Sequence, residues 1–308
     1  MNGGSVSVIV VTYNSRDDIT ACINSIPDAC ELIVIDNGSK DGTVQAVQNH
    51  PRSPVVIQNE TNFGFGAANN QGLRLASRPF ALLLNPDAFA HPGAIERLEQ
   101  VMRDQPEAAA CGGKLLNPDG SLQQSACREL TLWAVFTEQT LLEKLFNTYW
   151  ISGRFAQSNE PVRVAQVMGA CLMMRRFDGE FAMFDERFFL YCEDTELCKR
   201  LAEKGRILYV PDAVFTHRLG TSSVKDRARA VRMYNRGKEM YFKLHHGAFQ
   251  ALICFLLDRF GALLRLAIWI LASAGSLFLW KAAVSRVRVF AKVLFGPIDP
   301  YRASTGHN

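Results

Sequence analysis

Phe80-Ala-Leu-Leu-Leu-Asn-Pro-Asp87 is an apolar run that stops abruptly at an amide, a proline and a carboxylate. Five apolar residues without alternation predict a strand buried on both faces, as in the parallel sheets of α/β proteins. Ligands of open α/β sheets bind beyond the carboxyl ends of the strands. Asp87 is therefore placed where a carboxylate can hold a divalent cation against a diphosphate, although a cap or a solvated loop acid also fits it.

Strand and helix patterns alternate on either side of this run. Further strands are predicted over Ser5–Val11, Leu32–Ile35, Val55–Ile57, Ala108–Leu116, Val167–Met174 and Arg206–Val210. Helices are predicted over Arg16–Ile26, Gly93–Met102 and Glu193–Lys204, and a hairpin turn over Asn117–Gly120. This alternation predicts an α/β fold with a Rossmann-like, mostly parallel sheet flanked by helices on both faces. Residues 121–165 show no clean period.

Length and composition favour one large globular domain with an appendage, since the 308 residues are 48% hydrophobic and 21% charged. The 8 cysteines are scattered without C-x-x-C spacing, which predicts reduced core residues. Met1–Ser5 carries no basic segment of a secretory signal. We therefore expect a cytoplasmic protein.

The C-terminal region has a different composition. Residues 225–308 carry 14 Lys and Arg against 4 Asp and Glu, a net charge of +10, whereas residues 1–224 carry 20 against 26, a net charge of −6. We place a boundary near Ser223–Arg229, with a catalytic domain over 1–224 and a helical tail over 225–308. Ala248–Leu257 and Leu266–Trp280 are apolar, but the second is shorter than the ~20 residues that a membrane-spanning helix needs.

The end of this tail has the pattern of an interfacial helix. Lys281, Arg288 and Lys292 fall on one helical face, with Val284, Val287, Ala291 and Leu294 opposite. We expect peripheral association with the anionic inner face of the cell membrane, and the alternative is a buried helical cap with solvated basic residues. No base-reading or base-stacking motif is present, so we expect no nucleic-acid partner.

Polar residues follow the first two predicted strands. Thr12-Tyr13-Asn14 ends the first strand, and Asp36 ends the second at Asp-Asn-Gly-Ser. Because the carboxyl ends of parallel strands meet at one edge, these side chains predict a nucleoside pocket. Asp36 alone would also suit a helix N-cap or a turn.

A glycine motif follows the third strand. Asn62-Phe-Gly-Phe-Gly-Ala-Ala-Asn69 resembles G-x-G-x-x-G, but the sixth position is Asn69 and the motif does not follow the first strand, which argues against NAD. The glycines can still lie against a nucleotide at a helix N-terminus. The alternative is a simple loop in which Asn69 caps the helix.

Two later positions offer catalytic and metal-binding groups. Glu193-Asp194 opens a helix after the apolar segment Phe188–Cys192, so either carboxylate could be a desolvated general base, or both could simply stabilise the helix dipole. His217 follows a strand-like segment. It suits Mn²⁺ or Mg²⁺ on phosphate oxygens, or a structural role.

Together these motifs resemble the family 2 inverting glycosyltransferases of the GT-A fold, in particular the bacterial rhamnosyltransferase-like branch of O-antigen, lipopolysaccharide and cell-wall biosynthesis. The segments that carry the resemblance are Val8–Asn14, Val34–Gly42, Asn62–Gly66, Asn85–Asp87, Glu193-Asp194 and His217, over about Val6–Ser223. The resemblance implies a divalent cation on Asp87 and His217, with Asp194 as the base. It implies a nucleotide-sugar pocket formed by Thr12, Tyr13, Asn14, Asp36, Asn37, Asn62, Gly64 and Asn69. One departure is Asn85, which replaces the first acid of D-x-D and is expected to contact sugar or ribose.

The resemblance also implies an activity. We expect transfer of one sugar, rhamnose from dTDP-rhamnose as the first expectation, to a hydroxyl of a lipid-linked saccharide. The Q-x-x-R-W motif of processive synthases is missing from the sequence. The alternatives are sugar transfer to polyprenyl phosphate, a nucleotidyltransferase using the same metal site, and a non-catalytic nucleotide-binding scaffold.

Overall fold

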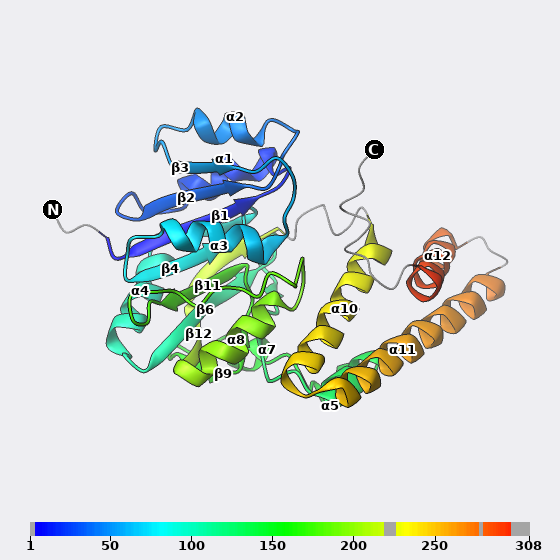
Figure 1. The fold of residues 1–308 in the computed structure, drawn as a ribbon. Helices are drawn as coiled ribbons and strands as arrows, with labels where there is room; N and C mark the ends of the chain where they lie inside the picture. The colour runs from blue at the N-terminus through cyan, green and yellow to red at the C-terminus, as the bar shows by residue number, and fades with distance from the viewer. Residues whose placement is uncertain (1–3, 219–225, 277–279, 297–308) are drawn as a thin grey trace. The chain divides into compact units, whose positions relative to one another are not determined.

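The computed structural model describes residues 4–218, 226–276 and 280–296 (Figure 1). It divides into two compact units. The first contains residues up to 129, 150–189 and from 193 to the end of the first described range; the second contains 130–149, 190–192 and the C-terminal helices. The predicted boundary lies at the gap between the first two described ranges. The sequence did not predict that 130–149 and 190–192 belong with the tail.

The first unit is built on one mixed sheet with the order β3-β2-β1-β4-β11-β6-β12-β5. Its parallel half consists of β1 (Val6–Thr12), β2 (Glu31–Asp36), β3 (Val55–Gln58) and β4 (Phe80–Leu84). The other half contains β5 (Ala88–Ala90), β6 (Ala108–Leu116), β11 (Cys171–Arg175) and β12 (Arg206–His217). The strand β11 is antiparallel to both β4 and β6, so it divides the sheet. The predicted α/β sheet is confirmed.

Short strands extend this framework. They are β7 (Leu122–Gln123), β8 (Ala126–Cys127), β9 (Val162–Val164) and β10 (Gln166–Val167). The strand β7 follows the predicted turn, where Gly120 adopts φ 80°, and pairs back on β6. The last strand, β12, runs through a register shift between Val210 and Val214 as far as His217, beyond its predicted end.

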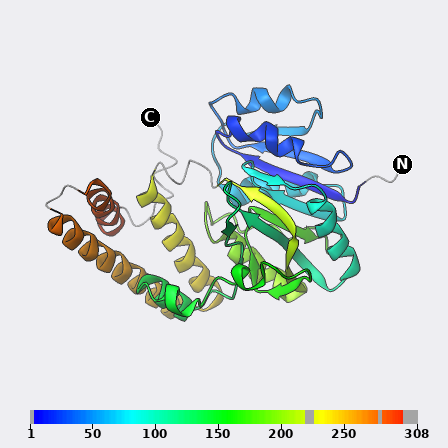
Figure 2. The same ribbon diagram turned by 180° about the vertical axis from the view of Figure 1, so that it is seen from behind.

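Helices cover both faces of the sheet (Figures 1 and 2). They are α1 (Arg16–Asn24), α2 (Thr43–Gln48), α3 (Phe65–Leu75), α4 (Ala94–Asp104), α7 (Ser152–Phe155) and α8 (Glu193–Lys204). Side chains of β1 alternate between two cores: Val8 and Val10 pack with α1 and α4, whereas Ile9 packs with α3 and α8. This two-sided burial explains the near-continuous apolar strands. All eight cysteines are free thiols, as predicted.

The second unit is helical. It contains α5 (Leu132–Gln139), α6 (Glu143–Phe146), α10 (Arg227–His245), α11 (Ala248–Gly275) and α12 (Lys281–Phe295). The two apolar stretches of the tail are largely one helix, because Asp258 and Arg265 do not interrupt it. Both side chains turn inward: Asp258 accepts from Lys238 at 2.7 Å, and Arg265 donates to the Gln139 carbonyl at 2.9 Å. Within the described ranges, no helix is both long and apolar enough to cross a membrane.

Candidate active site

The carboxyl ends of β1, β2 and β4 meet at one edge of the sheet. Thr12 pairs with Asp36 across β1 and β2, and Val10 pairs with Leu84 at the end of β4. The Asn37 amide donates to the Thr12 carbonyl at 2.8 Å, which continues this pairing past the strands. The register therefore brings the predicted nucleoside residues and the Asn85–Asp87 turn to the same edge.

Asp87 and His217 are adjacent, although they are far apart in the sequence. His217 pairs with Ala88 across β12 and β5, and its Nε2 lies 3.2 Å from Asp87 Oδ1. Both residues are buried, with exposed fractions of 4% for His217 and 8% for Asp87. A buried carboxylate beside a buried imidazole is an arrangement that metal sites share with structural ion pairs.

Gln123 fixes which nitrogen of His217 faces Asp87. The Gln123 amide Nε2 donates to Asn117 Oδ1 at 2.9 Å and to the His217 carbonyl at 3.3 Å. Its Oε1 must therefore accept from His217 Nδ1, 2.6 Å away. The proton of a neutral imidazole is then held on Nδ1, which leaves the Nε2 lone pair toward Asp87. Gln123 was not among the residues predicted from the sequence, where its position three residues after the Asn117–Gly120 turn was the only signal.

The positions of Asp87 and His217, with Asn85 beside them, are compatible with a bound divalent cation. Asn85 Nδ2 lies 3.3 Å from His217 Nε2, and the buried Asn85 Oδ1 has no hydrogen-bond partner among the described residues. No group of three or more His, Cys, Asp or Glu that could hold a metal occurs in the described part of the chain. Two protein ligands are nevertheless sufficient for Mg²⁺ or Mn²⁺ when phosphate oxygens and water complete the shell.

Asp36 uses its two oxygens differently. Its Oδ2 accepts from the amides of Gly38, at 3.2 Å, and Ser39, at 3.0 Å, so the turn function is present. Its Oδ1 is buried without a hydrogen-bond partner in the described residues, as is Thr12 Oγ1 on the neighbouring strand. Buried polar atoms normally have partners, so these two unpaired oxygens leave hydrogen-bonding capacity for a ligand.

The remaining loop residues fall into two groups. Tyr13 and Asn14 are exposed, and Asn14 Oδ1 accepts from the Lys40 amide at 2.9 Å, which links the two loops. Asn37 is buried, and its Nδ2 donates to Asn62 Oδ1 at 2.9 Å and to the Gly64 carbonyl at 3.2 Å. Asn37 and Asn62 therefore shape the loop, and their side chains are already engaged.

Gly64 is the N-cap residue of α3, with φ 92°. A Cβ at this position would lie 2.4 Å from the Phe189 carbonyl oxygen, so only glycine fits. Asn69 lies inside α3, where its Nδ2 donates to the Phe65 carbonyl at 2.9 Å. The alternative in which Asn69 caps this helix is wrong, because the helix begins four residues earlier at Phe65, directly after the positive φ of Gly64.

The two carboxylates at the start of α8 lie in different environments. Glu193 is buried, and burial together with the nearby Asp194 raises its pKa well above the usual range of a glutamic acid. Asp194 is half-buried and accepts from the amides of Gly169 at 3.0 Å and Thr195 at 2.8 Å. Burial also raises the pKa of Asp194, against these two hydrogen bonds. Only Asp194 combines a fixed orientation with access from outside.

One short segment connects Asp194 to the candidate metal ligands. Gly169 donates to Asp194, and the next residue, Ala170, accepts at its carbonyl from the Asn85 amide at 3.1 Å. The ring of Phe65, at the start of α3, packs against Gly169. The base candidate, the metal candidates and the glycine motif therefore lie around the same residues.

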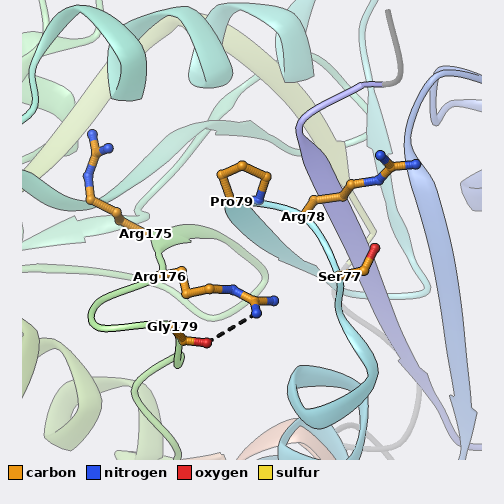
Figure 3. A pocket seen from close by; sticks show the side chains of 6 residues that line it. All are labelled: Ser77, Arg78, Pro79, Arg175, Arg176 and Gly179. Carbon is orange, nitrogen blue, oxygen red and sulfur yellow. Dashed lines mark hydrogen bonds between the residues drawn. The ribbon is translucent and has the colours of Figure 1, made fainter.

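A pocket of about 350 Å³ lies at the other end of β4, so it is separate from this site (Figure 3). Arg175, Arg176 and Arg78 contribute to its wall. Figure 3 shows that the Arg175 and Arg78 guanidinium groups point away from each other, and Arg176 donates to the Gly179 carbonyl at 3.1 Å. These arginines do not converge on a common ligand position.

This chain is similar to known proteins both in sequence and in fold. An N-acetylglucosaminyl-diphospho-decaprenol L-rhamnosyltransferase of Mycobacterium tuberculosis is 29% identical over 259 residues, which cover 78% of this chain and 84% of the relative. Among solved structures, a mannosyltransferase from Pyrobaculum calidifontis in complex with GDP-Man and Mn²⁺ has a TM-score of 0.52 at 18% identity, covering 94% of this chain and 87% of the other. S. aureus TarS 1–349 in complex with UDP has a TM-score of 0.51 at 19% identity, covering 96% and 92%. These two structures share the fold.

The model of the family described as "Glycosyl transferase family 2" matches residues 7–177, which is more than half of the chain. The match contains the ends of β1, β2 and β4 and the glycine motif described above. This chain is a member of glycosyl transferase family 2.

Proposed function

We propose that this glycosyltransferase moves one sugar from a nucleoside diphosphate donor to a hydroxyl group of a lipid-linked saccharide, with inversion at the anomeric carbon. The observation that carries the proposal is the Asp87–His217 pair, 3.2 Å apart. At the same sheet edge, Thr12 and Asp36 each keep an oxygen that has no hydrogen-bond partner in the described part of the chain. In this arrangement, the diphosphate of a bound donor would extend from the nucleoside pocket to a metal held by Asp87 and His217.

The donor would lie across this edge. Thr12 Oγ1 and Asp36 Oδ1 would hydrogen-bond the nucleoside, with Tyr13 beside it, and the diphosphate would extend toward Asp87 and the N-terminus of α3. The Asn85 amide would contact the sugar or the ribose. A divalent cation on Asp87 and His217, when bound, supplies charge that stabilises the departing diphosphate.

Asp194 would serve as the general base. A half-buried carboxylate with a raised pKa accepts a proton from a substrate hydroxyl more readily than an ordinary aspartate does. The attacking hydroxyl loses its proton to Asp194 as its oxygen bonds to the anomeric carbon, and the bond to the diphosphate breaks. Glu193 is less suited to this step, because its burial and the neighbouring Asp194 raise its pKa well above the usual range and disfavour the charged form that a base needs.

The proposal names rhamnose, from dTDP-rhamnose, as the sugar and a polyprenyl-diphosphate-linked saccharide as the acceptor. Support comes from the mycobacterial relative, whose name specifies L-rhamnosyl transfer to N-acetylglucosaminyl-diphospho-decaprenol. Such an acceptor resides in a membrane. We therefore also propose that the protein works at the cytoplasmic face of the cell membrane and is held there by the basic region 225–308.

A product assay with a donor panel tests the function. The full-length protein is incubated with UDP-, GDP- and dTDP-sugars, Mn²⁺ or Mg²⁺, and a lipid-linked N-acetylglucosamine acceptor. We expect release of nucleoside diphosphate in step with acceptor glycosylation, greatest with dTDP-rhamnose. Pyrophosphate release would identify a nucleotidyltransferase, transfer to polyprenyl phosphate would identify the other acceptor class, and nucleotide binding without turnover would identify a scaffold.

A further inference from the structure

The outer face of α11 is apolar along its whole described length, 248–275. Its most exposed large side chains recur at helical spacing and are each at least half exposed: Phe249, Leu252, Leu256, Phe260, Leu263 and Leu271. Every side chain of α11 that is exposed belongs to an apolar residue. A helix on the surface of a globular protein normally shows the opposite, with polar residues toward water.

The polar side chains of α11 are directed into the second unit. Asp258 is 2% exposed and bonds Lys238, which is itself fully buried and lies 3.2 Å from Glu138. Arg259 donates to the carbonyls of Val293 and Leu294 on α12. The charged groups of α11 are thus engaged inside the helical unit, and none is left to solvate the outer face.

The size of this face indicates an extended partner. At 1.5 Å per residue, the 28 residues of α11 give a helix about 42 Å long. The helix α5 packs beside α11, and α5–α6 carries further exposed rings, Trp133 and Phe146. Apolar surfaces of this extent on soluble proteins mark sites for membranes or other macromolecules.

Charge and aromatic residues favour lipid over a second copy of the chain. The Arg286 guanidinium of α12 lies 4.3 Å over the ring of Trp269, and Trp269 packs edge-to-face on Trp280. Tryptophan and basic side chains are typical of the headgroup level of a bilayer. Residues 225–308 carry +10, from 14 basic and 4 acidic residues, so two tails would repel each other whereas anionic lipid would attract them.

We infer that the outer face of α11 lies in the plane of an anionic membrane, with its apolar side chains at the boundary between headgroups and acyl chains. This inference rests on the proposed function, since a lipid-linked acceptor must be reached at a membrane. The inference also assigns the membrane contact to a different helix from the one that the sequence predicted. The sequence pointed to α12, but Val293 is buried and Leu294, Val289 and Phe290 pack against the helical core, so most of the apolar face of α12 is already covered.

Vesicle flotation of the full-length protein tests the inference. The vesicles contain phosphatidylglycerol and phosphatidylcholine, or phosphatidylcholine alone. The test variant carries Leu256→Glu with Leu263→Glu, which places two charges on the outer face of α11. The control is Leu75→Glu in α3, which adds a single charge of the same sign at an exposed leucine outside α11, 45% exposed.

We expect wild type and Leu75→Glu to float with the anionic vesicles, and the double variant to lose at least about tenfold in apparent partition, as two inserted charges require. Circular dichroism checks folding, and Leu271→Glu, at a residue 72% exposed, replaces the double variant if that variant unfolds. Flotation of the variants equal to wild type would overturn the inference. The inference would also be overturned if the wild-type protein stayed in the buffer and did not float with the vesicles. A wild-type dimer that the double variant converts to monomers in sedimentation would instead identify a second copy of the chain as the partner of α11. Vesicle binding without sugar transfer would count against the proposed function alone.

Discussion

Gln123 Oε1 accepts a hydrogen bond from His217 Nδ1 at 2.6 Å, and this contact connects the β7 hairpin to the end of β12 that is proposed to bind the metal. The Gln123 amide cannot turn over without losing its own bonds to Asn117 and to the His217 carbonyl. The tautomer of His217 is therefore set from outside the ligand pair, as for histidines whose second nitrogen bonds an outer partner.

Replacing Gln123 should weaken the cation site without removing a ligand. We expect Gln123→Leu to lower Mn²⁺-dependent affinity for the nucleoside diphosphate by about 10- to 100-fold, because the His217 proton is no longer held on Nδ1. Calorimetry with and without Mn²⁺ measures this loss. Gln123→Glu, which keeps an acceptor for Nδ1, should retain more of the affinity, and equal losses in both variants would argue against tautomer control.

Removing the carboxylate should have a larger effect on the same measurement. We expect Asp87→Ala to abolish the metal-dependent tightening of nucleotide binding, because a neutral imidazole alone supplies no countercharge. His217→Ala should behave as a weaker version, and Asn85→Ala should mainly weaken recognition of the donor sugar. Unchanged nucleotide affinity in Asp87→Ala at every Mn²⁺ concentration would rule out this carboxylate as a ligand.

The acid limb of the pH profile should report Asp194. A base acts when deprotonated, so kcat/KM falls as pH drops through its pKa, and a raised pKa moves that fall above the usual aspartate range. We expect Glu193→Gln to keep this limb, since glutamine replaces a buried carboxyl group that is not the proposed base. A limb that is lost in Glu193→Gln would show that the base has been assigned to the wrong carboxylate.

The buried lysine of the helical unit should be important for stability. Lys238→Met leaves Asp258 and Glu138 without their cation, and removing one partner of a buried pair typically costs about 3–5 kcal/mol. Urea unfolding followed by circular dichroism measures the loss. Lys238→Met with Asp258→Leu should recover part of it, because no unpaired carboxylate then remains at position 258. If Lys238→Met is as stable as wild type, the Lys238–Asp258 pair contributes little to the free energy of unfolding.

The sequence predicted the sheet well because burial on both faces leaves an unambiguous pattern. Phe80–Leu84 and Leu32–Ile35 are continuous apolar runs, and both lie in strands. The same patterns located Asp87 and His217 at strand ends. Their proximity could not be derived from periodicity, because it depends on β12 pairing antiparallel with β5 far away in sequence.

Other features depend on contacts that leave no local signal. Gln123 belongs to a two-residue strand, too short for any period, and its function comes from Asn117 and His217. In the sequence of the tail, the charged residues Asp258 and Arg265 separate two apolar segments and therefore suggested two separate elements. They are compatible with one helix because partners on α5 and α10 satisfy them, which only tertiary structure reveals.

The stereochemistry of transfer tests the central proposal most directly. Purified full-length protein is given the nucleoside diphosphate sugar that the donor panel selects, together with a lipid-linked N-acetylglucosamine acceptor, and the anomeric configuration of the product is determined by NMR. We predict a product of inverted configuration, formed with release of nucleoside diphosphate, and a rate about 10²- to 10⁴-fold lower in Asp194→Asn, whose donor binding is unchanged. Retained configuration, or an Asp194→Asn variant that turns over like wild type, would contradict the account.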